Sequence, residues 1–186
     1  MIDLLYKHAT SKTTLLRLVL TVLAGGFFLG LVAVFVLAGI WADRLSGLPA
    51  LPDCPWTLVP GIALAVLGPV LMFWSAFNFF RVRGTPVPLA PPPCLVCRGP
   101  YAHVRNPMLS GLFFLLFGLG FLLLSVSLVF VFTPVFILLN YLELKKVEEP
   151  ELVKRLGQDY VEYRKRVRMF IPRLRPYRKD PVSPQG

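Results

Sequence analysis

Three long stretches of the chain contain no charged residue, and they limit what it can fold into. They span residues 18–42, 54–80 and 106–142, with 25, 27 and 37 residues. An α-helix rises 1.5 Å per residue, so about 20 apolar residues cross the ~30 Å hydrocarbon core of a bilayer. With 55% hydrophobic and 16% charged residues, the chain is also too apolar for an ordinary soluble domain. The sequence therefore predicts a membrane protein.

The third stretch is too long for one crossing, since a single helix of this length would measure roughly 55 Å. Two helices of about 18 residues fit, and the hydroxyls of Ser125 and Ser127 indicate a break between them. The first stretch is longer than the core of a signal peptide, which has about 7–15 residues. We expect one all-α domain over residues 1–186, a polytopic membrane helix bundle with four transmembrane helices, or five if the Gly-rich first stretch bends.

Basic residues are unevenly distributed between the apolar stretches. Lys and Arg number 3 in residues 1–17, 1 in 43–53, 4 in 81–105 and 12 in 143–186. Because positively charged loops stay in the cytoplasm, both termini are expected there. The net charge of +10 and the basic, Pro-rich tail 174–186 favour anionic membrane lipids as partners. Nucleic acid is not expected as a partner, because the basic residues flank membrane segments.

The loop before the third apolar stretch carries two further patterns. Residues 84–93, GTPVPLAPPP, contain five prolines and predict a stiff, extended connector. Cys94 and Cys97 form one CxxC pair, but no second pair or nearby His pair completes a tetrahedral zinc site. The sequence therefore predicts no metal site.

Beyond the last apolar stretch, the pattern changes to that of an amphipathic helix. Pro150 suits a first helical turn, and Leu152, Leu156 and Tyr160 recur at intervals of four. We expect a cytoplasmic amphipathic helix over residues 150–167 that lies against the bundle or the bilayer. Docking at the membrane surface alone would explain this stripe.

Polar residues gather at the two ends of the predicted hairpin. Arg105 precedes its first helix, and Glu148 and Glu149 follow its second. A tight hairpin returns the chain to the face that it left, so Arg105 and the two carboxylates should become neighbours. Ionisable groups at a membrane boundary are costly unless they are paired or used. They form either a functional site or an ion pair that holds the hairpin together.

Residues 99–111, GPYAHVRNPMLSG, followed by Glu148-Glu149 after a hydrophobic hairpin, resemble a signature of two methyltransferase families. These are the isoprenylcysteine carboxyl methyltransferases and the phospholipid methyltransferases, whose cofactor-binding signature reads approximately Arg-His/Asn-Pro-x-Tyr-x-Gly and then Glu-Glu. The resemblance covers residues 78–173, the motif-bearing half of the domain. It departs in two places: Leu109 stands where the families usually carry Tyr, and Arg168-Met169 replaces Pro-Arg.

The resemblance implies S-adenosylmethionine as the cofactor and a lipophilic methyl acceptor that enters from the bilayer, either an isoprenylcysteine carboxylate or a lipid headgroup. It assigns Arg105 and Glu149 to the catalytic centre. An Arg can hold the cofactor's carboxylate through a planar fork of donors. The cofactor-binding residues that it implies are Tyr101, His103, Val104, Arg105, Asn106, Pro107, Leu109, Gly111, Glu148 and Glu149.

Two other functions stay open at this point. The C-terminal halves of membrane sterol reductases resemble the same fold and bind a nicotinamide cofactor, although this chain is short for such an enzyme and has no GxGxxG fingerprint. A small membrane scaffold whose charged ends only hold a hairpin together is the non-enzymatic alternative.

Overall fold

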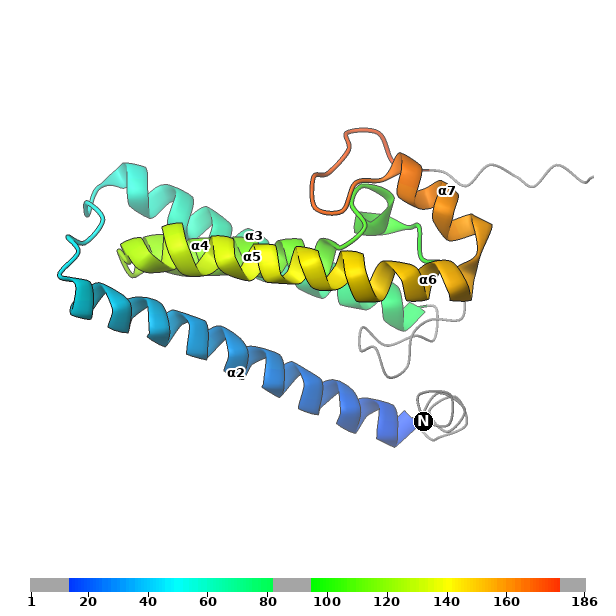
Figure 1. Ribbon diagram of the computed structural model, residues 1–186, viewed down its shortest axis with the longest axis horizontal. Helices are drawn as coiled ribbons and strands as arrows, with labels where there is room; N and C mark the ends of the chain where they lie inside the picture. The colour runs from blue at the N-terminus through cyan, green and yellow to red at the C-terminus, as the bar shows by residue number, and fades with distance from the viewer. Residues whose placement is uncertain (1–13, 82–94, 178–186) are drawn as a thin grey trace, which may run out of the picture.

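The computed structural model describes residues 14–81 and 95–177, and this part of the chain is helical and contains no strand. Figure 1 shows the helices of the bundle running along one axis, with the last two short helices at one end. The elements in chain order are α2 (Thr14–Ser46), α3 (Pro55–Arg81), the 3-10 turn η1 (Gly99–Ala102), α4 (Pro107–Leu122), the π turn η2 (Leu128–Phe132), α5 (Thr133–Glu143), the π turn η3 (Leu144–Glu148), α6 (Glu149–Leu156) and α7 (Gln158–Arg166).

Within residues 14–81 and 95–177, three helical stretches are long and apolar enough to cross a membrane, namely Leu29–Ser46, Pro55–Asn78 and Leu128–Leu156. The apolar helix α4 has only 16 residues. Its length of about 24 Å is less than the ~30 Å of a bilayer core. The prediction of an all-helical membrane protein is thus confirmed. The count of four or five crossings stays a prediction.

Helices α3 and α4 pack closely because small residues face each other along their contact. A Cβ added to Gly111 would lie 2.6 Å from the carbonyl oxygen of Gly68, and one added to Gly118 would lie 2.4 Å from the backbone nitrogen of Ala65. Real Cβ contacts are never this short, so only glycine permits the two backbones to approach at these points. This contact fixes the start of α4 relative to α3, and with it the polar loop, residues 99–106.

The third apolar stretch forms two helices, as the sequence predicts. Helix α4 ends at Leu122, and Leu124 follows with a φ of 53°. The N–H of Ser125 donates to the Gly120 carbonyl at 2.9 Å, and that of Leu124 donates to the Phe121 carbonyl at 3.2 Å. These two bonds form a Schellman cap, which normally has Gly at the left-handed position. The chain turns back at this cap.

The sequence predicts that a new helix starts at Pro150, but the helix that follows the hairpin turn does not end before this residue. It continues from Leu128 to Leu156, so Pro150 lies inside a continuous helix, and the expected helix start at this residue is wrong. The physical reason is the π turn η3: Glu149 donates its N–H to Leu144, five residues earlier. A wider turn before Pro150 accommodates a residue without an N–H. Pro134 follows η2 in the same way.

The expected helix over residues 150–167 is also divided. Gly157 adopts φ 60° and ψ −140°, a conformation that residues with a side chain rarely reach, and it separates α6 from α7. The bend directs α7 across the end of the bundle (Figure 1). Its Tyr160 and Tyr163 are buried against the polar loop.

Helix α2 contacts the rest of the bundle through its C-terminal half. Gly39 lies against Leu128, where an added Cβ would be 2.9 Å from the Leu128 Cβ. Val32 and Phe35 join the apolar core formed with α4 and α5. By contrast, a Cβ at Gly26 or Gly30 would meet no atom within 4 Å. Toward its N-terminal end α2 diverges from the other helices (Figure 1).

Several sequence predictions lie outside the described residues. These are the structure of residues 1–13, the proline-rich connector 84–93, and the tail beyond residue 177. Cys94 is also outside, so the structure does not describe the CxxC pair. Its partner in sequence, Cys97, is half-buried beside a cluster of tyrosines.

Candidate functional site

The polar loop before α4 is held against the end of α3. Gly99 has a φ of 59°, and a Cβ at this position would lie 2.8 Å from the side-chain nitrogen of Asn78. Only glycine satisfies both the conformation and the close approach. The turn η1 follows, with Tyr101 and Ala102 buried. Residues 103–106 are thereby fixed at the N-terminal end of α4.

Arg105 and Glu149 form an ion pair at this end of the bundle. The second carboxylate oxygen of Glu149 accepts a hydrogen bond from Arg164 on α7 at 3.2 Å. Arg105 also lies 3.4 Å from the hydroxyl of Tyr160. The side chains of Arg105 and Glu149 are each 11% exposed, so both charges are largely removed from water. The two ends of the hairpin therefore meet, as the sequence predicts, through Arg105 and Glu149.

The guanidinium of Arg105 is only partly satisfied. Its Nε is buried, and no acceptor lies within hydrogen-bonding distance of it among the described residues. A buried donor without a partner costs about 1–3 kcal/mol. Arg105 contacts Glu149 and Tyr160 through one terminal nitrogen, Nη1. The group therefore retains a donor for a further anionic oxygen.

An irregular segment after α7, residues 167–177, closes the site from the other side. We refer to it as the strap. Its carbonyls at Arg168 and Met169 accept hydrogen bonds from the backbone of Arg105 and Asn106, at 2.9 and 3.1 Å. Further along, the backbone N–H of Tyr177 donates to the Ala102 carbonyl at 2.8 Å. The strap thus runs beside the polar loop, and its carbonyls hold the backbone of Arg105 and Asn106 in place.

His103 is another anchor for the strap. Its ring nitrogen Nδ1 lies 2.8 Å from the Arg173 carbonyl, which can only accept, so Nδ1 carries the proton. The backbone carbonyl of His103 accepts from the Arg173 N–H at 2.9 Å. The resemblance implies that His103 binds the cofactor, and the contact that the structure shows for this residue is with the strap.

Buried tyrosines form the inner wall of the site. The hydroxyl of Tyr163 donates to the Tyr101 carbonyl at 2.6 Å, and the Tyr163 ring packs edge-on against Tyr177. Burial raises the pKa of Tyr163 well above the usual value of a phenol, and burial, with the nearby charge of Glu148 as a smaller cause, does the same for Tyr101. Both hydroxyls therefore stay protonated.

The remaining residues that the resemblance assigns to the site occupy different environments. Val104 and Pro107 are buried, and Asn106 makes no capping bond with its side chain at the start of α4. Leu109 packs against the apolar core. Gly111 faces Gly68 and Met72 on α3.

Glu148 and Glu149 differ although they are adjacent. Glu149 is buried between two guanidinium groups, whereas Glu148 is half-buried at the end of η3. After burial, the charge of Glu148 is the smaller cause of the raised pKa of Tyr101. The structure thus separates the ion-pairing role, which Glu149 fills, from the position of Glu148 at the rim.

Sequence reasoning missed two features of this site. Arg164, the second cation on Glu149, is one of twelve basic residues after the last apolar stretch, so its charge does not single it out. Its spacing of four from Tyr160, which belongs to the predicted amphipathic stripe, was the available signal. The strap was missed because irregular backbone has no periodic pattern.

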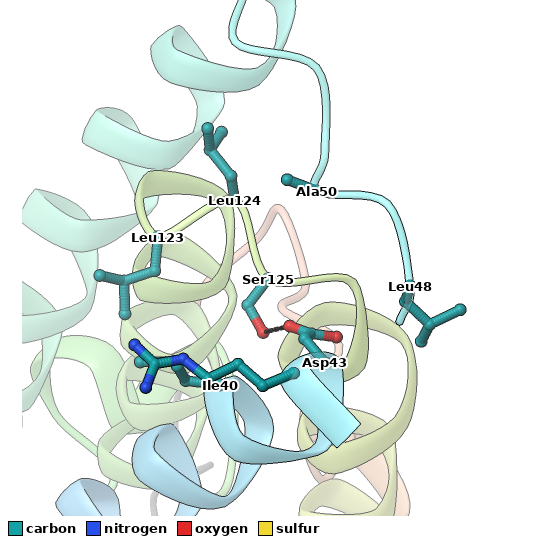
Figure 2. A pocket seen from close by; sticks show the side chains of 8 residues that line it. Ile40, Asp43, Leu48, Ala50, Leu123, Leu124 and Ser125 are labelled. Atoms are coloured by element: carbon teal, nitrogen blue, oxygen red, sulfur yellow. Dashed lines mark hydrogen bonds between the residues drawn. The ribbon is translucent and has the colours of Figure 1, made fainter. Parts of the chain in front are cut away.

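Two cavities lie away from Arg105 and Glu149. One, of about 280 Å³, is lined by Leu31, Phe35, Phe136, Leu139, Asn140 and Glu143, between α2 and the α5 helix. The other, of about 220 Å³, lies between the C-terminal end of α2, the loop after it and the turn after α4, and Figure 2 shows it from close by. There the Ser125 hydroxyl points to the carboxylate of Asp43, and Ile40, Arg44, Leu48, Ala50, Leu123 and Leu124 complete the lining.

The described residues form a helical bundle with three stretches able to cross a bilayer. At one end of the bundle lies a buried Arg–Glu pair. The fold and the site therefore define a class, that of membrane proteins with a polar site at the end of an apolar helix bundle. Residues 56–159 match the family model of phospholipid methyltransferases. The match spans more than half of the 186 residues and includes Arg105 and Glu149, so the chain belongs to this family. A comparison with curated proteins gives no match.

Proposed function

We propose that the protein is an S-adenosylmethionine-dependent methyltransferase that acts on a lipophilic acceptor. The observation that carries this proposal is the buried Nε of Arg105, which has no acceptor among the described residues. It lies beside Glu149 and the Tyr160 hydroxyl. The methionine moiety of the cofactor has a carboxylate for the guanidinium and an amino group for a carboxylate, so these residues fit it.

In this proposal Arg105, Glu149 and Tyr160 hold the cofactor, which supplies an electrophilic methyl group when bound. The protein's own contribution is to align the acceptor with that group and to exclude water. Buried Tyr101 and Tyr163 and the strap keep solvent from one side of the site. Arg164 neutralises part of the charge on Glu149 and keeps its carboxylate oriented.

The lipophilic part of the acceptor has a candidate binding place in the cavity between α2 and α5. Four of its six lining residues are apolar, and Asn140 and Glu143 form its polar end. Glu143 precedes Glu149 by six residues, or about 9 Å along a helix. An acyl or prenyl chain in this cavity would place its head at the polar end formed by Asn140 and Glu143. The family favours a phospholipid headgroup over an isoprenylcysteine carboxylate as that head.

Both rivals make different predictions about ligand binding. A nicotinamide-dependent reductase would bind a nicotinamide dinucleotide in place of S-adenosylmethionine. A scaffold would bind neither, because its Arg105–Glu149 pair would only hold the hairpin together. The pair has the same geometry in either case, so ligand binding separates these functions.

The test is calorimetry of the purified full chain in lipid nanodiscs, titrated separately with S-adenosylmethionine and with reduced nicotinamide dinucleotide. Saturable binding of S-adenosylmethionine alone is expected. Transfer of a labelled methyl group to a lipid extract then identifies the acceptor class. If the protein binds only the nicotinamide dinucleotide, or binds neither ligand, the proposal is refuted.

A further inference from the structure

The strap has a second face, which points away from Arg105. The strap leaves the end of α7 and passes back beside η1 toward the apolar part of the bundle (Figure 1). Its path is fixed from both sides, by backbone bonds to residues 102–106 and by a hydrogen bond from the Arg173 side chain to the Arg166 carbonyl at 3.1 Å. The outer face of the strap is therefore held in a defined position.

The contact of Phe170 with α4 indicates how deep the strap lies relative to the bilayer. Its ring packs edge-on against Phe113, with centroids 5.1 Å apart, and Phe113 in turn contacts Phe136 of α5. Phe113 is six residues into α4, or about 9 Å from the helix start. In the predicted topology α4 crosses the bilayer from its start at Pro107, which places Phe113 within or at the edge of the hydrocarbon core. In that topology Phe170, which contacts Phe113, reaches the level of the acyl chains.

Next to Phe170, the strap exposes apolar side chains. Ile171 is 61% exposed and Leu174 is 99% exposed. A single exposed apolar residue is common on protein surfaces. Two such residues beside the Phe170 ring, at the depth of the acyl chains, form a surface suited to lipid. Residues 164–177 also contain six basic residues and no acidic one. Arg168 and Arg175 are exposed on either side of the two apolar residues.

We propose that the strap docks on the anionic surface of the bilayer, with Ile171 and Leu174 inserted at the boundary of the acyl chains. The arginines on either side then contact lipid phosphates. Apolar anchors flanked by basic residues are the combination that binds membrane interfaces, since burial and charge act together. The strap in this position keeps its carbonyls at Arg168 and Met169 available for the backbone of Arg105 and Asn106.

Spin labels on single cysteines test the depth of the strap in the full chain. In a background with Cys54, Cys94 and Cys97 replaced by Ser, the variants are Leu174→Cys, Glu162→Cys and Leu138→Cys. Glu162 is exposed on α7, and Leu138 is 55% exposed on α5, so they serve as the aqueous and the lipid reference. Each variant is placed in vesicles of phosphatidylcholine with phosphatidylglycerol and in vesicles of phosphatidylcholine alone.

The measurement is the ratio of label collisions with oxygen, which concentrates in lipid, to collisions with a water-soluble nickel chelate. In anionic vesicles we expect the ratio at position 174 to be several-fold above that at 162 and close to that at 138. It should fall in vesicles without phosphatidylglycerol. A ratio at 174 equal to that at 162 overturns the proposal. Shielding from both reagents also overturns it, because another part of the chain would then cover Leu174. Equal ratios in the two lipids would refute the contribution of the arginines.

Discussion

Asp43 on α2 accepts a hydrogen bond from the hydroxyl of Ser125, 82 positions later in the chain. Its other carboxylate oxygen accepts from the backbone N–H of Ser127 at 2.8 Å. Ser125 in turn accepts from the N–H of Leu128 at 3.1 Å, so it caps the helix that follows. One carboxylate thus joins the end of α2 to the turn of the hairpin, at the end of the bundle far from Arg105.

Replacing Asp43 with Ala should destabilise the fold. The substitution leaves the donors of Ser125 and Ser127 without their acceptor, at a cost of about 1–3 kcal/mol. The measurement is the thermal unfolding midpoint in nanodiscs. Asp53→Ala is the matched control, since Asp53 is an exposed carboxylate in the following loop. Equal midpoints for the two variants would contradict the role of Asp43.

Gly111→Ala should be destabilising although alanine is a better helix former. The new Cβ would meet the Gly68 carbonyl oxygen at 2.6 Å and Met72 Cγ at 2.8 Å, so α3 and α4 must separate, at a cost of about 1–3 kcal/mol. Gly30→Ala is the control, because nothing lies within 4 Å of its Cβ. Its unfolding midpoint should not fall. If Gly111→Ala has the same unfolding midpoint as the parent, α3 and α4 are not this close.

The stability of the protein should fall as pH rises above about 10. Burial raises the pKa of Tyr163 in the folded state above that of the unfolded chain, about 10. Stability from the protonated phenol is therefore complete below that pH, and it is lost as the unfolded state ionises. Tyr163→Phe should unfold more easily at pH 7, because its bond to the Tyr101 carbonyl is missing, and should lose less stability between about pH 9 and about pH 11. Parallel curves for the parent and the variant would contradict this assignment.

The loop between α2 and α3 should face away from the cytoplasm. Residues 43–53 contain one Lys or Arg, against twelve in residues 143–186. In the cysteine-free background, Leu48→Cys should react with a membrane-impermeant thiol reagent added to intact cells, and Glu162→Cys should react only after lysis. Both positions are exposed, so reactivity reports location. The reverse pattern would show that the topology is inverted.

The sequence could predict the hairpin and the meeting of Arg105 with Glu149 that results from it. Apolar length requires a turn near Ser125, and a turn there returns Glu149 to Arg105. The continuation of the helix through Pro150 was not predictable in the same way. Proline normally stops a helix, but the π turn before it removes the conflict. No residue type is specific to such a turn.

Long-range backbone contacts account for most of what the sequence did not reveal. The strap is held by bonds from Arg105 and Asn106 to the carbonyls of Arg168 and Met169, and any side chains could accompany them. Gly111 was assigned to the cofactor by resemblance, and its contact with Gly68 depends on the register of α3 against α4. Neither contact follows from local propensity.

The proposed function depends on the recognition of a carboxylate by Arg105, and calorimetry with two ligands tests this most directly. S-adenosylmethionine and its decarboxylated analogue differ by the group that Arg105 would bind. The parent should bind the first more tightly. Arg105→Lys has no planar fork and should lose about 10–150-fold in affinity for it, or about 1.5–3 kcal/mol, with little change for the analogue. Thermal unfolding confirms that the variant is folded. If the parent binds both ligands equally, or if Arg105→Lys binds S-adenosylmethionine as the parent does, Arg105 does not hold the cofactor and the proposed site is wrong.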